Sequence, residues 1–71
     1  MIQIADAKTI GKRLVKLRGK RTKRTVQIET GLKYSTLCMY EGGYRIPNDQ
    51  AKAILASYYG VSIEELFYTS K

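Results

Sequence analysis

Hydrophobic residues recur at helical spacing in the first third of the chain. Ile10, Leu14 and Leu17 stand at positions i, i+4 and i+7, which is the spacing of the buried side of an amphipathic helix. The positions between them that are expected to face water are Lys12, Arg13 and Lys16. The pattern therefore predicts a helix from about Ala7 to Arg18 or Lys20.

The segment 22–41 continues this spacing in two shorter pieces separated by a glycine. Val26 and Thr30 are four positions apart, and Gly31 follows them. A helix can end at such a glycine, because glycine adopts a positive φ without steric cost. Leu32 comes next and is expected to be buried between the two pieces. We therefore predict two short helices joined by a tight turn.

The second of these short helices has a hydrophobic inner side and a chemically varied outer side. Leu37 and Tyr40 or Glu41 mark the inner side, and the outward positions are Tyr34, Ser35, Cys38 and Met39. Two helices joined in this way form a helix-turn-helix when the second helix enters the major groove of duplex DNA. An ordinary helix hairpin in a small bundle has the same pattern. This segment alone therefore does not distinguish a hairpin from a helix-turn-helix, and the rest of the sequence is needed.

A two-glycine turn and a proline separate this segment from a further helical pattern. Gly42-Gly43 closes the third helix, and the chain from Tyr44 to Pro47 is predicted to be an extended loop. A fourth helix then continues to residue 58 or 59 and stops at Gly60, and a short fifth helix follows. The buried side of the fourth helix is assigned to Ile54 or Leu55, Ala56 and Tyr59.

Each predicted helix apart from the third has a polar N-cap candidate. The candidates are Asp6, Thr22, Asn48 or Asp49, and Ser62, the last of which forms a capping-box pattern with Glu65. Residues 1–5 read as an extended lead-in and residues 69–71 as a tail, and no strand pattern or repeat is evident. The prediction is a compact all-α domain of five helices that covers residues 1–71.

The residue inventory excludes several kinds of chemistry. The chain of 71 residues has one cysteine, Cys38, and no histidine, so an internal disulfide, a structural zinc site and a histidine-based triad are excluded. No paired carboxylates or nucleophile–base set are evident, and we expect neither an enzyme nor a cofactor. With no apolar run of 18 residues and no signal-peptide pattern, the expected location is the cytoplasm, without a membrane partner.

Positive charge is concentrated in one part of the chain. Thirteen Lys and Arg residues stand against six Asp and Glu, which gives a net charge of +7. Nine of the basic residues lie between Lys8 and Arg24, where there is no acidic residue. Such a basic half favours a polyanionic partner, with nucleic acid ahead of a membrane surface. A solvated lysine-rich face that serves solubility is the alternative.

The order and spacing of these features resemble the phage-repressor-like (Cro and XRE type) helix-turn-helix family over residues 10–67, with the helix-turn-helix at 22–41. The residues that carry the resemblance are Ile10-Gly11-Lys12-Arg13-Leu14, Leu17-Arg18, Gly31-Leu32, Ser35-Thr36-Leu37, Tyr40-Glu41-Gly42-Gly43, Arg45-Ile46-Pro47 and Gly60-Val61-Ser62-Ile63-Glu64-Glu65-Leu66-Phe67. The resemblance implies a lambda-repressor-like DNA-binding domain without a small-molecule ligand.

The resemblance also implies roles for individual residues. It pairs Arg18 with Glu41 as a structural ion pair, and it gives base contacts to the outward residues of the third helix. Phosphate contacts fall to Lys23 and to the loop after the third helix. Basic residues that flank the third helix add Lys33 to this set. The predicted DNA-binding residues are Thr22, Lys23, Lys33, Tyr34, Ser35, Thr36, Met39, Tyr44 and Arg45.

Some positions depart from the family pattern. Lys33 stands where the family favours a serine or threonine cap, so the third helix either begins uncapped or starts at Ser35. Ile28 falls on a face that is normally polar, where it either covers the first helix or lies exposed. The outer side of the third helix lacks Arg, Asn and Gln, so Met39 is left to make apolar contact, for instance with a thymine methyl group. Cys38 is interpreted as a small spacer.

The resulting functional expectation is a sequence-specific transcriptional regulator, a repressor that binds a palindromic operator in double-stranded DNA as a homodimer. Its lack of a sensor domain is typical of a phage or mobile-element regulator. Tyr58, Phe67 and Tyr68 either belong to the core or form a dimer surface. An antitoxin-type DNA-binding protein and a basic, non-enzymatic protein-interaction module are the alternatives.

Overall fold

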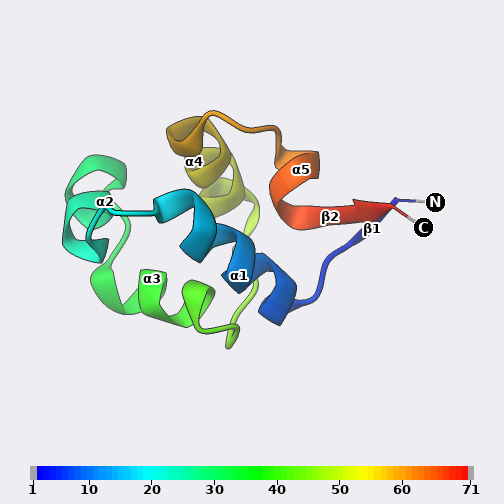
Figure 1. Ribbon diagram of the computed structural model, residues 1–71, viewed down its shortest axis with the longest axis horizontal. Helices are drawn as coiled ribbons and strands as arrows, with labels where there is room; N and C mark the ends of the chain where they lie inside the picture. Colours follow the sequence, from blue (N-terminus) through cyan, green and yellow to red (C-terminus); the bar gives the residue numbers. More distant parts are fainter. Residues whose placement is uncertain (1, 71) are drawn as a thin grey trace.

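The computed structural model describes residues 2–70, so that Met1 and Lys71 lie outside the described residues. Figure 1 shows a small helical body from which the two ends of the chain leave side by side. The elements in chain order are β1 (Ile2–Ile4), α1 (Ala7–Arg18), α2 (Lys23–Thr30), α3 (Tyr34–Glu41), α4 (Asp49–Tyr59), α5 (Ile63–Phe67) and β2 (Tyr68–Ser70). The prediction of five helices is confirmed, and the two strands are an addition to it.

The predicted N-caps are in place. The side chain of Asp6 accepts from Thr9 N at 2.7 Å, and the equivalent bonds of Thr22, Asn48 and Ser62 begin α2, α4 and α5. Ser62 and Glu65 form a complete capping box. The hydrogen bond from the Thr9 backbone holds the pKa of the Asp6 carboxyl below its usual value. Short polar side chains therefore set the helix starts, because each satisfies an otherwise unpaired amide of the first turn.

The chain ends, predicted as a lead-in and a tail, instead pair as a two-stranded antiparallel sheet. Ile2 pairs with Ser70 and Ile4 with Tyr68, and the amide of Ala5 donates to the carbonyl of Phe67 at 2.8 Å. Three-residue strands carry almost no periodic signal, and their partners lie at opposite ends of the sequence. The prediction of an unpaired lead-in and tail without strands was therefore wrong.

The prediction that Arg13 faces water on the polar side of α1 was also wrong, because its side chain is engaged by another segment. Its Nη1 donates to the carbonyls of Glu65, Leu66 and Tyr68, at 3.1, 3.3 and 2.8 Å. These carbonyls belong to the last turn of α5 and the start of β2, where helix carbonyls lack partners within the helix. Arg13 therefore ties α1 to the C-terminal segment.

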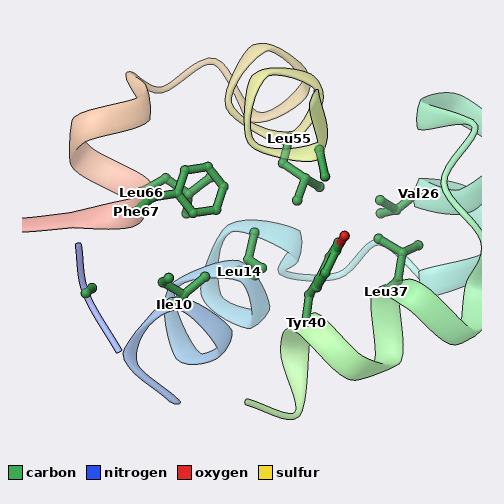
Figure 2. Close-up of a cluster of buried hydrophobic side chains, with 10 residues drawn as sticks. Ile10, Leu14, Val26, Leu37, Tyr40, Leu55, Leu66 and Phe67 are labelled. Carbon is green, nitrogen blue, oxygen red and sulfur yellow. The ribbon is translucent and has the colours of Figure 1, made fainter. Parts of the chain in front are cut away.

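The core lies where α1, α3, α4 and α5 meet (Figure 2). Ile10 and Leu14 are buried as predicted, whereas Leu17 packs against the core while partly exposed. On α4, Leu55 rather than Ile54 is buried. The larger residues of the core are Ile10, Leu14, Val26, Leu37, Tyr40, Leu55, Leu66 and Phe67. Phe67 thus belongs to the core rather than to a surface for a second copy.

Lys52 is a buried residue that the pattern of α4 did not indicate. Its side chain is 10% exposed, and its ammonium lies 5.4 Å from the centre of the Tyr68 ring and 4.0 Å from an oxygen of Asp49. A lysine can be buried in this way because its alkyl stem packs on apolar surface while its charged end meets an aromatic face.

Gly11 allows the closest approach between α1 and α3. A Cβ atom at this position would lie 2.7 Å from the carbonyl oxygen of Glu41 and 2.8 Å from that of Tyr40. Because both obstacles are backbone atoms, a side chain cannot be accommodated by a rotamer change. The glycine therefore fixes how closely α3 packs on α1.

Replacing Gly11 by Ala is expected to lower the free energy of unfolding by about 1–3 kcal/mol, the usual cost of overpacking. Urea denaturation followed by circular dichroism would measure it. Thr9→Ala, on the same helix and away from this contact, is the control and should change stability less. Equal stability of the Gly11→Ala variant and the parent would show that α1 and α3 do not pack this closely.

Residues 2–70 contain no helix long and apolar enough to cross a membrane. The same residues contain no group of three or more His, Cys, Asp or Glu side chains placed to hold a metal ion.

Candidate nucleic-acid interface

The turn between α2 and α3 is built as the sequence predicts. Gly31 has φ of +78°, and its amide donates to the carbonyl of Gln27 at 2.9 Å. The hydroxyl of Thr30 donates to the carbonyl of Val26 at 2.6 Å and accepts from the amide of Leu32 at 3.2 Å. Leu32 packs against the core and is partly buried, so its predicted burial is confirmed in part.

The side of α3 that faces away from the core is open to solvent. Leu37 and Tyr40 point inward, whereas Tyr34 is 48% exposed, Met39 is 42% exposed and Ser35 is also exposed. We call Tyr34, Ser35 and Met39 the outer face of α3. Cys38, predicted to point outward, lies half-buried at its edge.

The third helix begins at Tyr34, and Lys33 occupies its N-cap position without a side-chain cap. The amides of its first turn therefore remain available to an external acceptor, unlike those of the four capped helices. A helix N-terminus with free amides also carries partial positive charge, which favours an anion in front of it.

On α2, the side chain of Ile28 is 71% exposed and so does not cover α1.

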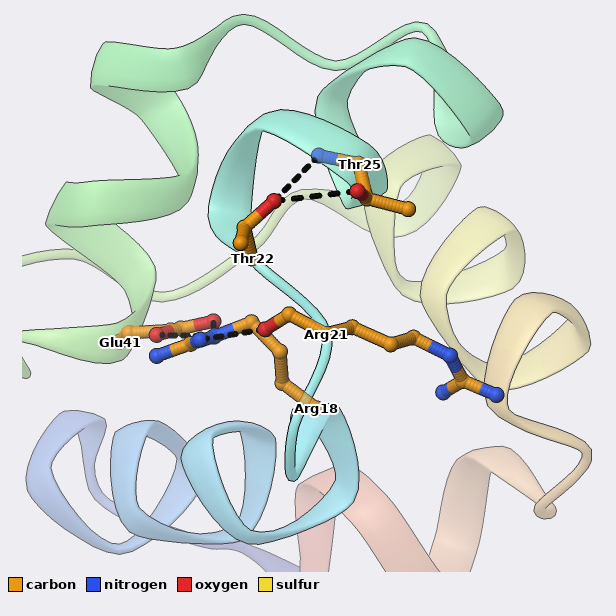
Figure 3. Close-up of polar contacts among 5 residues, drawn as sticks. All are labelled: Arg18, Arg21, Thr22, Thr25 and Glu41. Atoms are coloured by element: carbon orange, nitrogen blue, oxygen red, sulfur yellow. Dashed lines mark hydrogen bonds and ion pairs between the residues drawn. The ribbon is translucent and has the colours of Figure 1, made fainter.

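An ion pair holds the C-terminal end of α3 against α1 (Figure 3). The Nε of Arg18 donates to both carboxylate oxygens of Glu41, at 2.9 and 3.1 Å, and its Nη1 donates to the carbonyl of Arg21 at 2.7 Å. The side chains are 19% and 6% exposed. The hydrogen bond to Glu41 raises the pKa of Arg18 above its usual value. The predicted pair is confirmed, although one N–H serves both oxygens and the other end of the guanidinium binds the linker.

Arg21 has a structural role that the sequence reasoning missed. Its guanidinium carbon lies 5.3 Å from the centre of the Tyr58 ring and 5.8 Å from that of Tyr59. The two rings meet edge to face at 4.9 Å, and the Tyr58 hydroxyl donates to the carboxylate of Glu29 on α2. Burial raises the pKa of Tyr59 to about 12. Arginine over aromatic faces is a stabilising arrangement, and here it fixes the linker between α1 and α2 on α4.

Basic side chains border the outer face of α3. Arg24, Lys33 and Arg45 are exposed and Lys23 is half-exposed. We call these four residues the basic rim. They stand at the start of α2, at the start of α3 and in the loop after α3. No acidic residue belongs to the outer face or to the rim.

An open hollow of about 390 Å³ lies between the turn, α3 and the start of α4. Lys33, Thr36 and Arg45 line it together, so Thr36 contributes to this hollow rather than to the outer face. Two further polar residues on its wall, Asn48 and Gln50, were not among the predicted site residues. They come close only because the loop folds back beside the turn, and no local pattern signals this.

The loop after α3 presents an aromatic ring to solvent. Tyr44 is 78% exposed, and its ring lies against Gly42, where a Cβ atom would come within 2.7 Å of Cε2.

The hydroxyl of Thr22 lies 3.0 Å from that of Thr25 and also accepts from the Thr25 amide at 3.1 Å. Thr22 is therefore engaged in capping α2, and its position next to Lys23 keeps it at the rim.

Of the predicted residues, the structure brings Lys33, Thr36 and Arg45 together in the hollow and exposes Tyr34, Ser35 and Met39 on α3. The outer face offers hydroxyl groups and a thioether, and the rim offers positive charges and unpaired helix amides. This arrangement can bind an anionic, elongated partner and contact its apolar and polar groups along one helix. Comparison with protein-family models, with curated proteins and with solved structures finds no match.

Proposed function

We propose that this protein is a sequence-specific regulator of transcription that binds duplex DNA through a lambda-repressor-like helix-turn-helix made of α2 and α3. The observation that carries the proposal is the exposed outer face of α3, together with the basic rim at the starts of α2 and α3 and in the loop after α3. Such a helix fits the major groove of B-form DNA, where base edges are distinguishable.

The division of chemistry within the site supports duplex DNA as the partner. Lysine and arginine bind phosphates and set the position of the protein, whereas groove contacts to base edges select the sequence. The outer face carries Tyr34, Ser35 and Met39, which offer two hydroxyls and one apolar contact. Because these groups make no bidentate contact, each base pair contributes modest discrimination.

We further propose that the protein acts as a repressor and binds a palindromic operator as a homodimer. A single α3 has only eight residues, so its outer face contacts few base pairs and two copies on adjacent half-sites are needed for useful selectivity. Binding of two linked copies also raises affinity through effective concentration. Occupation of a promoter would then block transcription, as in a phage or mobile-element regulator of the cytoplasm.

Two single substitutions test this proposal. Met39→Ala should change base preference at about one position, by about fourfold if the apolar contact with one methyl group contributes about 0.8 kcal/mol. Lys23→Ala should instead weaken binding to all duplexes alike and reduce the log–log salt slope by about 1. Fluorescence anisotropy with a panel of single-base operator variants measures both. Unchanged base preference in Met39→Ala would contradict the proposed docking of α3.

A further inference from the structure

Four lysines form a row along α1. They are Lys8, Lys12, Lys16 and Lys20, each four residues after the previous one, and all four are exposed. The first three lie on α1, and Lys20 follows directly after its C-cap, Gly19. At about 1.5 Å of rise per residue the three lysines on α1 extend over roughly 12 Å. We call these residues the lysine row.

Within the row, Lys12 and Lys16 lie on a different side of α1 from the residues that contact α3. Gly11 and Arg18 make those contacts. Lys8 instead lies beside Gly43, just after α3, where a Cβ atom on the glycine would come within 3.1 Å of the Cα of Lys8. Lys12 follows Gly11 by one residue, which is about 100° around the axis of an α-helix, and Lys16 is roughly 140° from Gly11. Figure 1 shows α1 crossing the front of the molecule while α3 lies along its lower edge. A partner bound at Lys12 and Lys16 therefore leaves the outer face of α3 free.

No lysine of the row forms an ion pair within residues 2–70, although Lys8 and Lys12 lie close enough to Asp6 to help lower the pKa of its carboxyl. The ion pairs there are Arg18–Glu41 and Lys52–Asp49, neither of which includes the row. The nearest acid along the chain is Asp6, which is engaged as the N-cap of α1. Lysines four residues apart on a helix repel one another. Binding of an anion relieves this repulsion between Lys8, Lys12 and Lys16.

The chemistry of the row fits the phosphate backbone of a duplex. Lysine carries a hydrated point charge on a flexible stem and binds phosphate without the directional fork of arginine. Stacking on unpaired bases needs aromatic side chains, and the sequence from Lys8 to Lys20 contains none. The row therefore has the means to bind a double-stranded backbone but not to distinguish its sequence.

We propose that the lysine row binds the backbone of a second DNA duplex, without sequence selection, while α3 binds the first. The protein would thereby bridge two segments of DNA. The inference rests on the proposed function, because bridging requires the α3 surface as well as the row.

The experiment compares two variants with the same change of charge. The row variant carries K8Q, K12Q, K16Q and K20Q, and the rim variant carries K23Q, R24Q, K33Q and R45Q; each lowers the net charge from +7 to +3. The full chain is bound to an immobilised duplex and washed, and capture of a second, fluorescent duplex is then measured. Circular dichroism confirms that each variant keeps its helices.

The wild-type protein should capture the second duplex. The row variant should remain on the first duplex within a few-fold of wild-type affinity but capture at least tenfold less of the second. Capture by the row variant equal to that of the wild type, or no capture by the wild type, would overturn the proposal. If the true partner of the row is an acidic protein, the wild type should capture no second duplex.

The rim variant separates this inference from the proposed function. If α3 binds DNA, the rim variant should lose most of its affinity for the first duplex. If it binds the first duplex as tightly as the wild type, the proposed function fails, and so does bridging between α3 and the row. If the rim variant no longer binds the first duplex, and the wild type binds the first duplex but captures no second one, only the bridging inference fails.

Discussion

Raising the salt concentration from about 50 mM to about 200 mM should weaken binding to duplex DNA by a factor on the order of 10³–10⁵. This range applies to proteins that neutralise about 6–10 phosphates, because each contact releases condensed counterions into solution. Two copies of the basic rim and the uncapped start of α3 provide contacts of that number. Anisotropy titrations at several salt concentrations give the slope of log affinity against log salt.

The slope should be on the order of −6 to −10 for a dimer. When a rim residue is replaced by Gln, the magnitude of the slope should fall by about 0.9 for every phosphate that the variant no longer neutralises. A titration with sucrose at constant salt is the control, since it changes the solution without supplying counterions. An affinity that does not respond to salt would contradict a DNA complex held by the rim.

The largest effect on stability is expected for Glu41→Ala. Its carboxylate is 6% exposed, and removing it leaves the guanidinium of Arg18, which is 19% exposed, without its charged partner. Breaking a buried pair by removing one member costs about 3–5 kcal/mol, and the lower end applies here because Arg18 keeps some contact with water. In a domain of this size that corresponds to a fall in Tm of roughly 4–8 °C per kcal/mol.

A double-mutant cycle isolates the pair from other effects. The combined Arg18→Ala and Glu41→Ala variant should be less destabilised than the sum of the two single variants, since no unpaired charge remains. Arg18→Ala alone also loses the bond to the carbonyl of Arg21, so its cost includes release of the α1–α2 linker. Additive effects in thermal unfolding would show that the two side chains do not interact.

Helices were predictable because their signals are local. The N-caps Asp6, Thr22 and Ser62 each lie three residues from the amide they bind, and Gly31 and Gly60 end helices with positive φ as glycines commonly do. The strands at the termini were not predictable, because three residues give no period and the partner segment lies roughly 65 residues away along the chain.

The candidate site was predictable to the extent that it follows helix geometry. The exposure of Tyr34 and Met39 and the inward position of Leu37 follow from the spacing of one helix. The hollow between the turn and α4 did not follow, because Asn48 reaches it only through the path of the loop. Arg21 was missed for the same reason, since its partners Tyr58 and Tyr59 lie on a distant helix.

The central claim is that the outer face of α3 and the basic rim together select a sequence in duplex DNA. In-vitro selection from a random duplex library at near-physiological salt tests it most directly. We expect enrichment of a two-fold symmetric motif whose half-sites lie about one helical turn apart, and loss of that enrichment in the rim variant. A selected pool that remains random would contradict the account.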